Sequence, residues 1–266
     1  MAKGNDGNYL QHSVEVEAAS RLARIGGDGR LHIAMTHGMA PFEPFGGKAG
    51  QVRGNLDAAL TASREPSLPG DSAIVAAYRE TGASADNYPN SAELLRSAIG
   101  AGKLSGGITE IDPTKCDQLS DAWAGSRVVP RCSSWRREMD AGGILACPES
   151  LQAPWLFTMD SMTYTEGNAA DDDKLHRADI HLLSATLGRY IKSGQPGIAA
   201  FFVYAMWRER GRFWNFIDEL QDLIGAVSVS FWLTHRGGSQ NLAALLCSGT
   251  ELPPAFAPAG VNAGRT

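Results

Sequence analysis

Two acidic side chains stand where apolar, strand-like segments end, which is a common position for functional residues. Glu110 and Asp160 each close such a segment, GGITEID and PWLFTMD. Thr36 and His37 end a third apolar segment, RLHIAMTH, which leads into a Gly/Pro-rich stretch. Ligands of open α/β sheets bind beyond the carboxyl ends of the strands, so we expect these side chains around one crevice. A carboxylate there can accept hydrogen bonds from hydroxyl or amino groups of a ligand.

Each candidate also has a plainer interpretation. Glu110 could be a surface acid at a strand end, and Asp160 could simply cap the turn that follows it. His12 and His37 could flank the crevice, but a single histidine is more often a hydrogen-bonded structural residue.

The other charged clusters point less clearly to a site. Arg131, Arg136 and Arg137 surround Trp135 and could contact phosphate or a stacked ring, although a solvated helix face is the simpler interpretation. The acidic run DDDK at 171–174 is typical of a turn that faces water. The sequence has no P-loop, no GxSxG and no zinc-deaminase pattern, and we expect no metal site.

The elements that must position these residues alternate along the chain. Strand-like apolar segments are separated by single helices, which favours parallel pairing through right-handed crossovers. The last two strands are joined by THRGGSQ, too short for a parallel crossover, and are expected to form an antiparallel hairpin. We predict seven strands, at 30–37, 107–112, 127–131, 155–160, 198–206, 227–233 and 242–247.

The remaining segments are mostly helical. An apolar stripe of Leu10, Val14, Ala18, Leu22 and Ile25 predicts a first helix that starts near Asn8. A small helical insertion is expected at about 50–90, inside one domain spanning 1–250. Ser91 is the expected N-cap of the helix after it, and the tail 251–266, which has no periodicity, is predicted to be disordered.

Composition narrows the class of protein. The chain has 266 residues, 43% hydrophobic and 20% charged, and a formal net charge of -5, which argues against a general nucleic-acid binder. It has no signal-like leader and no apolar run of membrane-spanning length, so we expect a cytoplasmic protein with no membrane partner. Its scattered cysteines, Cys116, Cys132, Cys147 and Cys247, are expected to be reduced and mostly buried.

Several short segments, in order, resemble one enzyme family. They are KGNDGNYLQHSV at the N-terminus, the strand ending in Thr36 and His37, YPNSAELL, ITEIDPTKC and FTMDSMTY. Together they resemble the ribosomal RNA adenine-N6 methyltransferases of the large-subunit type, over roughly residues 4–248. The resemblance implies a Rossmann-like class I methyltransferase fold that binds S-adenosylmethionine.

The resemblance also implies roles for individual residues. Glu110 would bind the cofactor ribose, and Asp160 and Tyr164 would orient and stack on the base that carries the amine. The other cofactor-binding positions would be Gln11, His12, Thr36, His37, Gly38 and Ser133.

The chain departs from the family pattern in several of these places. Gln11 stands where the family has a lysine, Met39 and Pro41 where it has glycines, and Ser133 where it has an acid. The catalytic loop DSMTY lacks the family's prolines.

Two functions therefore stay open. The first is an S-adenosylmethionine-dependent methyltransferase acting on an amine of a nucleic acid or a small molecule. The second is a non-methylating protein of the same fold that binds another ligand or a protein partner. The altered loops favour the second function, whereas the retained Glu110 and Asp160 favour the first.

Overall fold

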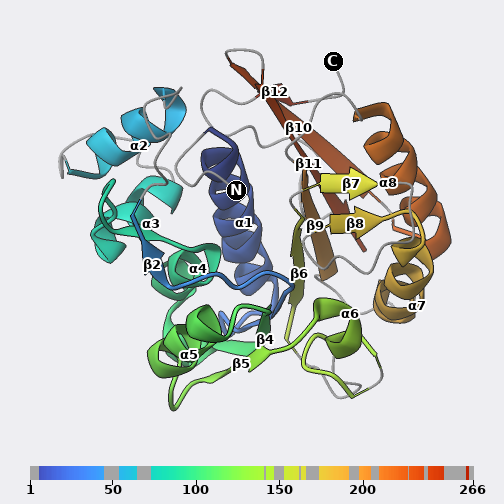
Figure 1. Ribbon diagram of the computed structural model, residues 1–266, viewed down its shortest axis with the longest axis horizontal. Coiled ribbons are helices and arrows are strands. Elements are labelled where there is room, and N and C mark those ends of the chain that lie inside the picture. Colours follow the sequence, from blue (N-terminus) through green and yellow to red (C-terminus); the bar gives the residue numbers. More distant parts are fainter. Residues whose placement is uncertain are drawn as a thin grey trace.

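A central β-sheet with helices on both faces organises the chain (Figure 1). The computed structural model describes residues 6–44, 54–64, 73–140, 142–146, 153–161, 163–165, 174–191, 198–204, 210–226, 228–236, 239–248 and 262–263. None of the helices within these ranges is long and apolar enough to cross a membrane.

The sheet has eight strands in the order β12-β10-β11-β9-β6-β1-β4-β5. Neighbours from β5 to β9 pair in parallel, and β11 runs antiparallel to both β9 and β10. The strands are β1 (Leu31–Met35), β4 (Leu104–Glu110), β5 (Arg127–Cys132), β6 (Trp155–Asp160), β9 (Ile198–Tyr204), β10 (Ser228–Arg236), β11 (Ser239–Cys247) and β12 (Asn262–Ala263).

The chain reverses its direction of travel across the sheet at β1. It moves outward from β1 through β4 to β5, then returns to the other side of β1 with β6 and continues to β9. The gap between β1 and β6 is thus a topological switch point, the place where open α/β sheets bind their ligands. β4 and β1 approach each other closely, because a Cβ on Gly106 would lie 1.9 Å from the Ile33 carbonyl oxygen. β4 therefore needs glycine at this position.

Two separate apolar cores cover the two faces of the sheet. Side chains alternate between them along each strand, as the pleat requires: Ile33 and Leu156 join one core, whereas Ala34 and Phe157 join the other. The first core is covered by α1 (Asp6–Ile25), α2 (Gly54–Arg64), α3 (Ala73–Thr81), α4 (Ser91–Ile99) and α5 (Pro113–Ala122), and the second by α6 (Trp135–Glu138), α7 (Asp179–Ile191) and α8 (Arg210–Ile224).

Helix α1 is buried on more than one side, unlike the single stripe predicted for it. One side packs against β6, β9, β10 and β11, and the helices α2, α3 and α4 cover the other (Figure 1). Polar residues outside the stripe, such as Gln11, Ser13 and Glu15, are therefore buried as well.

Short elements complete the fold, two strand pairs after the carboxyl ends of β1 and β6 and a turn before the amino end of β4. They are the pairs β2 (Phe42–Glu43) with β3 (Tyr88–Pro89) and β7 (Thr163–Thr165) with β8 (Lys174–His176), and the 3-10 turn η1 (Ala101–Lys103).

The α/β class, the mostly parallel sheet and the antiparallel C-terminal hairpin are confirmed, but the number of strands was wrong. The eighth strand, β12, is a two-residue segment that pairs with β10. It lies inside the tail expected to be disordered, where apolar periodicity is too short to reveal it. The N-cap of α4 is Asn90 rather than Ser91, because the Asn90 side chain accepts the Glu93 N–H at 2.8 Å.

Candidate functional site

A pocket opens at the switch point, beyond the carboxyl ends of β1 and β6. Its free space, including the open mouth, is about 370 Å³. The lining residues come from α1, from the loop after β1, from β3 and the start of α4, and from the end of β6: Asn8, Gln11, His12, His37, Gly38, Met39, Tyr88, Pro89, Asn90, Ser91 and Asp160.

Gln11 connects two sides of this pocket. Its amide nitrogen donates to Asp160 Oδ2 at 3.1 Å and to Ser91 Oγ at 3.1 Å. All three side chains are buried, with Asp160 only 9% exposed. Both amide protons are therefore committed, which fixes the orientation of Gln11 and holds the Asp160 carboxylate at the pocket.

His12 belongs to a ring of hydrogen bonds with two tyrosines. Its Nδ1 lies 3.2 Å from the Tyr78 hydroxyl and 2.9 Å from the Tyr88 hydroxyl, and the hydroxyls are 3.0 Å apart. The His12 ring also stacks on Tyr88, with centroids 5.4 Å apart. Burial raises the pKa of both phenols, so they stay neutral and can donate. His12 is thus a hydrogen-bonded wall of the pocket, as the plainer interpretation held.

The loop after β1 is tightly built. The Thr36 hydroxyl contacts His37 Nδ1 at 2.6 Å, and Gly38 N donates to the Thr109 carbonyl at 2.7 Å. A Cβ on Gly38 would lie 2.6 Å from side-chain atoms of Ile108 and Leu119, so only glycine fits there.

Met39 adopts φ 55°, the left-handed region that glycine enters most easily. Methionine therefore adopts a backbone conformation that favours glycine, and the loop tolerates the local strain.

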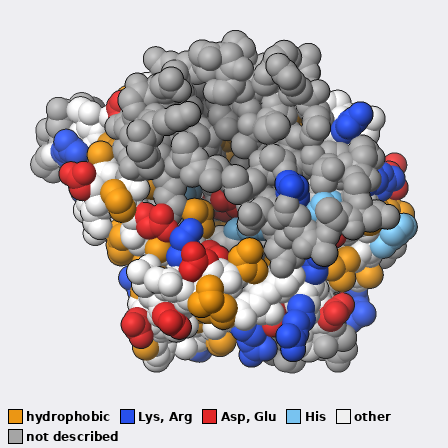
Figure 2. All heavy atoms as spheres, in the orientation of Figure 1, with side chains coloured by type: hydrophobic (Ala, Val, Ile, Leu, Met, Phe, Trp, Pro, Cys, Tyr) orange, Lys and Arg blue, Asp and Glu red, His pale blue; other side chains and the backbone are white. Residues whose placement is uncertain are grey.

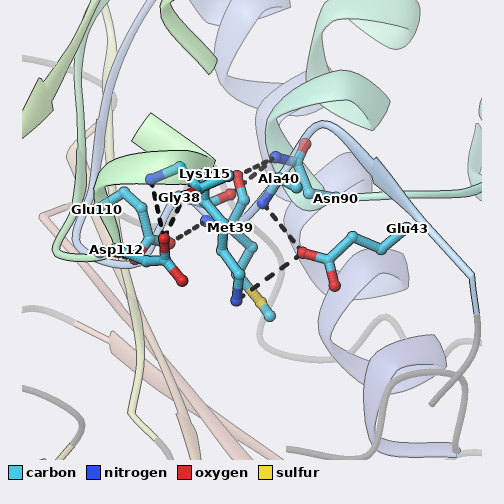
Figure 3. Close-up of polar contacts among 9 residues, drawn as sticks. Gly38, Met39, Ala40, Glu43, Asn90, Glu110, Asp112 and Lys115 are labelled. Atoms are coloured by element: carbon cyan, nitrogen blue, oxygen red, sulfur yellow. Dashed lines mark hydrogen bonds and ion pairs between the residues drawn. The ribbon is translucent and has the colours of Figure 1, made fainter. Parts of the chain in front are cut away.

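Glu110 and Asn90 hold this loop in place (Figure 3). Glu110 Oε2 accepts the Met39 N–H at 2.7 Å, and Oε1 accepts the Asp112 N–H at 2.9 Å. Asn90 donates to the Gly38 carbonyl at 2.7 Å and to the Met39 carbonyl at 3.3 Å. Because each carboxylate oxygen has two acceptor positions, Glu110 keeps one position on each oxygen for a ligand.

The last N–H group of the loop is also committed. Ala40 N donates to Glu43 Oε1 at 3.3 Å, and Lys115 Nζ lies 3.9 Å from the same oxygen. With Gly38 and Met39 bonded as above and Pro41 lacking an N–H, the loop directs its donors inward.

Glu15 is the residue that the sequence analysis missed. It lies one turn after Gln11 on α1, is 1% exposed, and its Oε2 has no hydrogen-bond partner among the described residues. Burial is the main cause that raises the pKa of Glu15 to about 8; a hydrogen bond with Ser91 lowers it, and the charge of Asp160 raises it by less than that. Glu15 is therefore mostly protonated at neutral pH.

Ser133 and Tyr164 are predicted site residues that are not among the described residues that line the pocket. Ser133 N donates to the Glu110 carbonyl at 3.1 Å, which places Ser133 next to Glu110 at the end of β5. The backbone of Tyr164 lies in β7, but its side chain falls outside the described residues.

The basic cluster around Trp135 is structural. Trp135 is 1% exposed, and Arg136 forms two 2.8 Å contacts with the Asp179 carboxylate and stacks on the indole. Arg131 pairs with Glu138 at 3.4 Å. Arg136 joins α6 to α7 through its contact with Asp179. It is therefore neither free to bind phosphate nor part of a solvated helix face.

The cysteines and possible metal ligands add no further site. Cys116 and Cys247 are buried and Cys132 is exposed, all as free thiols, whereas Cys147 lies outside the described residues. Within the described ranges, no group of three His, Cys, Asp or Glu side chains is arranged to hold a metal ion.

Comparisons with known proteins support the fold. The sequence matches no family model and no curated protein. The structure is similar to that of a Legionella pneumophila protein of family DUF519, with a TM-score of 0.65 and 11% identity, covering 98% of this chain and 97% of that one. A Leishmania major SAM-dependent methyltransferase of family DUF858 matches with a TM-score of 0.32 and 13% identity, over 88% and 82% of the two chains. At such identities, the first likeness shows a shared fold alone.

Most of the predicted site residues thus meet at one place. Gln11, His12, His37, Gly38 and Asp160 line the pocket, while Thr36 and Glu110 hold its loop from beneath. The arrangement places carboxylates, carbonyl groups and histidines around a space at the switch point, and this set can accept hydrogen bonds from hydroxyl and amino groups.

Proposed function

We propose that this protein is a methyltransferase that uses S-adenosylmethionine to methylate an amine. The observation that supports it most is the meeting of Gln11, Gly38 and Asp160 in one pocket at the switch point, with Glu110 against the loop. This is where the fold binds ligands, and where the resemblance assigns both cofactor and acceptor.

The residues fit one end of the cofactor well. The open acceptor positions of Glu110 suit the two ribose hydroxyls, and Ser133 stands beside it where the adenine would lie. The inward-directed N–H groups of Gly38, Met39 and Ala40 leave the carboxylate end of the methionine to other donors. His37, at the rim of the pocket, is the nearest candidate that the loop offers.

The cofactor would supply an electrophilic methyl group, and the chain would supply orientation. Asp160, held by Gln11, would accept a hydrogen bond from the acceptor amine and aim its lone pair at the methyl carbon. Tyr164, close behind it in the chain, would stack on an aromatic acceptor. A nucleobase amine and a small-molecule amine both suit this chemistry.

A charge argument bears on the choice between these acceptors. The face shown in Figure 2 intersperses acidic, basic and hydrophobic side chains over its described part rather than presenting one broad basic surface. With a net charge of -5, this favours a small amine or a short single-stranded segment over a long duplex.

The experiment that tests the proposal is direct binding followed by transfer. Purified protein is titrated calorimetrically with S-adenosylmethionine and S-adenosylhomocysteine, then incubated with radiolabelled donor and RNA, DNA or a set of small amines. We expect binding of both cofactor forms and label on one acceptor class.

The second function, a non-methylating binding protein, is supported by the loop after β1. The N–H groups of Gly38, Met39 and Ala40 already donate to other residues of the protein and are not free to bind a cofactor carboxylate. It forecasts that neither cofactor form binds and that no acceptor is labelled. Absence of binding at millimolar cofactor would therefore replace the enzyme by this alternative.

A further inference from the structure

Two carboxyl groups share one hydrogen-bonded cluster behind the pocket. Asp160 comes from the end of β6 and Glu15 from α1. Gln11 donates one 3.1 Å hydrogen bond to Asp160 and another to Ser91. Ser91 and Gln11 are also the hydrogen-bonding neighbours of Glu15. A charge that enters the pocket beside Gln11, Ser91 and Asp160 therefore acts on both carboxyls.

The buried carboxyl group of Glu15 destabilises the folded protein. A carboxyl that is 1% exposed, with one oxygen unpartnered among the described residues, has lost its water without a full set of replacements. On α1, the next turn beyond Glu15 offers it only the buried side chains of Ala18 and Ala19, which cannot form hydrogen bonds. Such a group is more often retained at a functional site than in a packed core.

The pocket offers little to an anion. No lysine or arginine is among the described residues that line it. The N–H groups of Gly38, Met39 and Ala40 donate to Thr109, Glu110 and Glu43. The described lining does include oxygen acceptors, namely the Asp160 carboxylate, the Ser91 hydroxyl and the Tyr88 hydroxyl.

We propose that this pocket contains a subsite for a positively charged organic group, an ammonium or a sulfonium, with Asp160 and Glu15 as its two carboxylates. The inference rests on the proposed function in one respect: S-adenosylmethionine carries both kinds of cation. It goes further by assigning Glu15 and by stating which charge the pocket selects.

Proton release should accompany binding at this subsite. Glu15 is neutral in the free protein because burial and the Asp160 charge raise its pKa to about 8. A cation nearby favours the ionised carboxyl, so binding draws the proton off and affinity rises with pH.

The other titratable groups around the cluster are accounted for within the described residues. Asp160 of β6 is the one whose charge acts on Glu15. His12 of α1 is bonded to Tyr78 of α3 and Tyr88 of β3, and Glu93 of α4 pairs with Arg96.

The test uses a permanent cation, so that the probe itself does not titrate. Trimethylsulfonium is titrated into the full-length protein and into Glu15→Gln, at about pH 6 and about pH 7.5, and binding is followed by NMR. Linkage through a group with a pKa near 8 predicts that the parent binds about 20-fold more tightly at the higher pH. The variant, which matches protonated glutamic acid in shape, should show little change. Tert-butanol, a neutral compound of similar size, should show no pH dependence with either protein.

S-adenosylmethionine is the second probe, measured under the same conditions. The ratio of parent to variant affinity removes the titration of the ligand's own amino group, which is common to both. Calorimetry of the parent in two buffers of different ionisation enthalpy counts the released proton without any variant, and so keeps the test valid if Glu15→Gln folds poorly.

The outcomes separate the two proposals. If S-adenosylmethionine binds with the same pH dependence in parent and variant and no proton is released, the subsite is wrong and the methyltransferase proposal stands. If trimethylsulfonium shows the Glu15-dependent slope but S-adenosylmethionine does not bind, the subsite stands and the methyltransferase proposal falls. If neither probe binds, both are wrong.

Discussion

Asp160 shows how a single side chain can be held ready for a reaction. Its Oδ2 accepts from Gln11 at 3.1 Å, and Gln11 is in turn fixed by Ser91. If Asp160 orients an acceptor amine, Asp160→Ala should lower methyl transfer at saturating S-adenosylmethionine by about 100-fold or more, because orientation acts on the transition state. Loss of the Asp160 charge from the cation subsite should in addition weaken S-adenosylmethionine binding. Asp160→Asn should be milder, since the amide oxygen still accepts one hydrogen bond.

The measurement is the initial rate of radiolabelled methyl transfer to whichever acceptor the screen identifies, with calorimetry of S-adenosylhomocysteine as the binding control. Transfer by Asp160→Ala at the parental rate, with normal cofactor binding, would remove Asp160 from the mechanism.

Glu110 makes a different prediction, because it supports the loop and is also proposed to bind the cofactor ribose. Replacing it by glutamine leaves one oxygen, which can accept either the Met39 or the Asp112 N–H but not both. If Glu110 also accepts two ribose hydroxyls, Glu110→Ala should weaken cofactor binding by roughly 2–4 kcal/mol, and Glu110→Gln by about half of that.

Calorimetry of the two variants, together with their thermal melting, separates a lost ligand contact from a collapsed loop. Methylthioadenosine, which has the ribose but no amino acid end, should lose as much affinity as the full cofactor does. Unchanged affinity in Glu110→Ala would show that Glu110 serves the loop alone.

At the scale of the elements, Asn90 joins a helix to the site. Its Oδ1 caps α4 through the Glu93 N–H, and its Nδ2 donates to the carbonyls of Gly38 and Met39. Asn90→Ala should therefore lower the free energy of unfolding by about 2 kcal/mol, the sum of a cap and a loop hydrogen bond.

Two further variants separate the contribution of the helix cap from that of the loop hydrogen bonds. Asn90→Asp keeps the cap but loses the donor, so it should retain the stability of α4 while loosening the loop. Ser97 also lies on α4, and Ser97→Ala removes only its exposed contact with Glu80 of α3, so this variant should stay within about 0.5 kcal/mol of the parent in urea unfolding. A loss in Ser97→Ala equal to that in Asn90→Ala would show that the cap has no special role.

The strands and the C-terminal hairpin could be predicted from the sequence better than the contacts around the pocket could. The apolar segments around Ile33 and Phe157 carry the strand signal in their own composition, and the short link 234–240 dictates an antiparallel hairpin. Glu110 and Asp160 could be placed at one edge because parallel strands share their carboxyl ends. Glu15 could not be found this way: periodicity reports one buried stripe of α1, and only the packing of α3 and α4 on its other side buries the acid.

The loop contacts were also beyond the reach of the sequence. Nothing local indicates that Met39 takes a left-handed conformation or that Asn90, rather than Ser91, begins α4. Both follow from the approach of β3 to the loop after β1, where Asn90 N donates to the Pro41 carbonyl at 2.9 Å.

At the scale of the whole molecule, two buried titrating groups act on stability in opposite directions. Burial lowers the pKa of His32 to about 4, so the neutral ring stabilises the fold above pH 6.5 and this stabilisation is lost as pH falls toward 4. The pKa of Glu15, raised to about 8, has the reverse effect. The folded state holds the Glu15 proton from pH 4.5 to about 8 while the unfolded chain releases it, so stability falls as pH rises through this window.

These signs predict how variants diverge from the parent. Glu15→Gln should match the parent near pH 4.5 and become more stable than it by on the order of 3 kcal/mol at pH 7, because it has no proton to hold. His32→Asn should show the opposite trend, with a stability that rises relative to that of the parent as pH falls from 6.5 toward 4. Chemical unfolding of the three proteins across this range measures both differences.

Between pH 4.5 and 6.5 the two effects oppose each other in the parent, so its own profile should be flatter than that of either variant. Parallel profiles for parent and Glu15→Gln would mean that Glu15 is ionised in the folded protein, and the cluster with Asp160 would then already be charged before any ligand arrives.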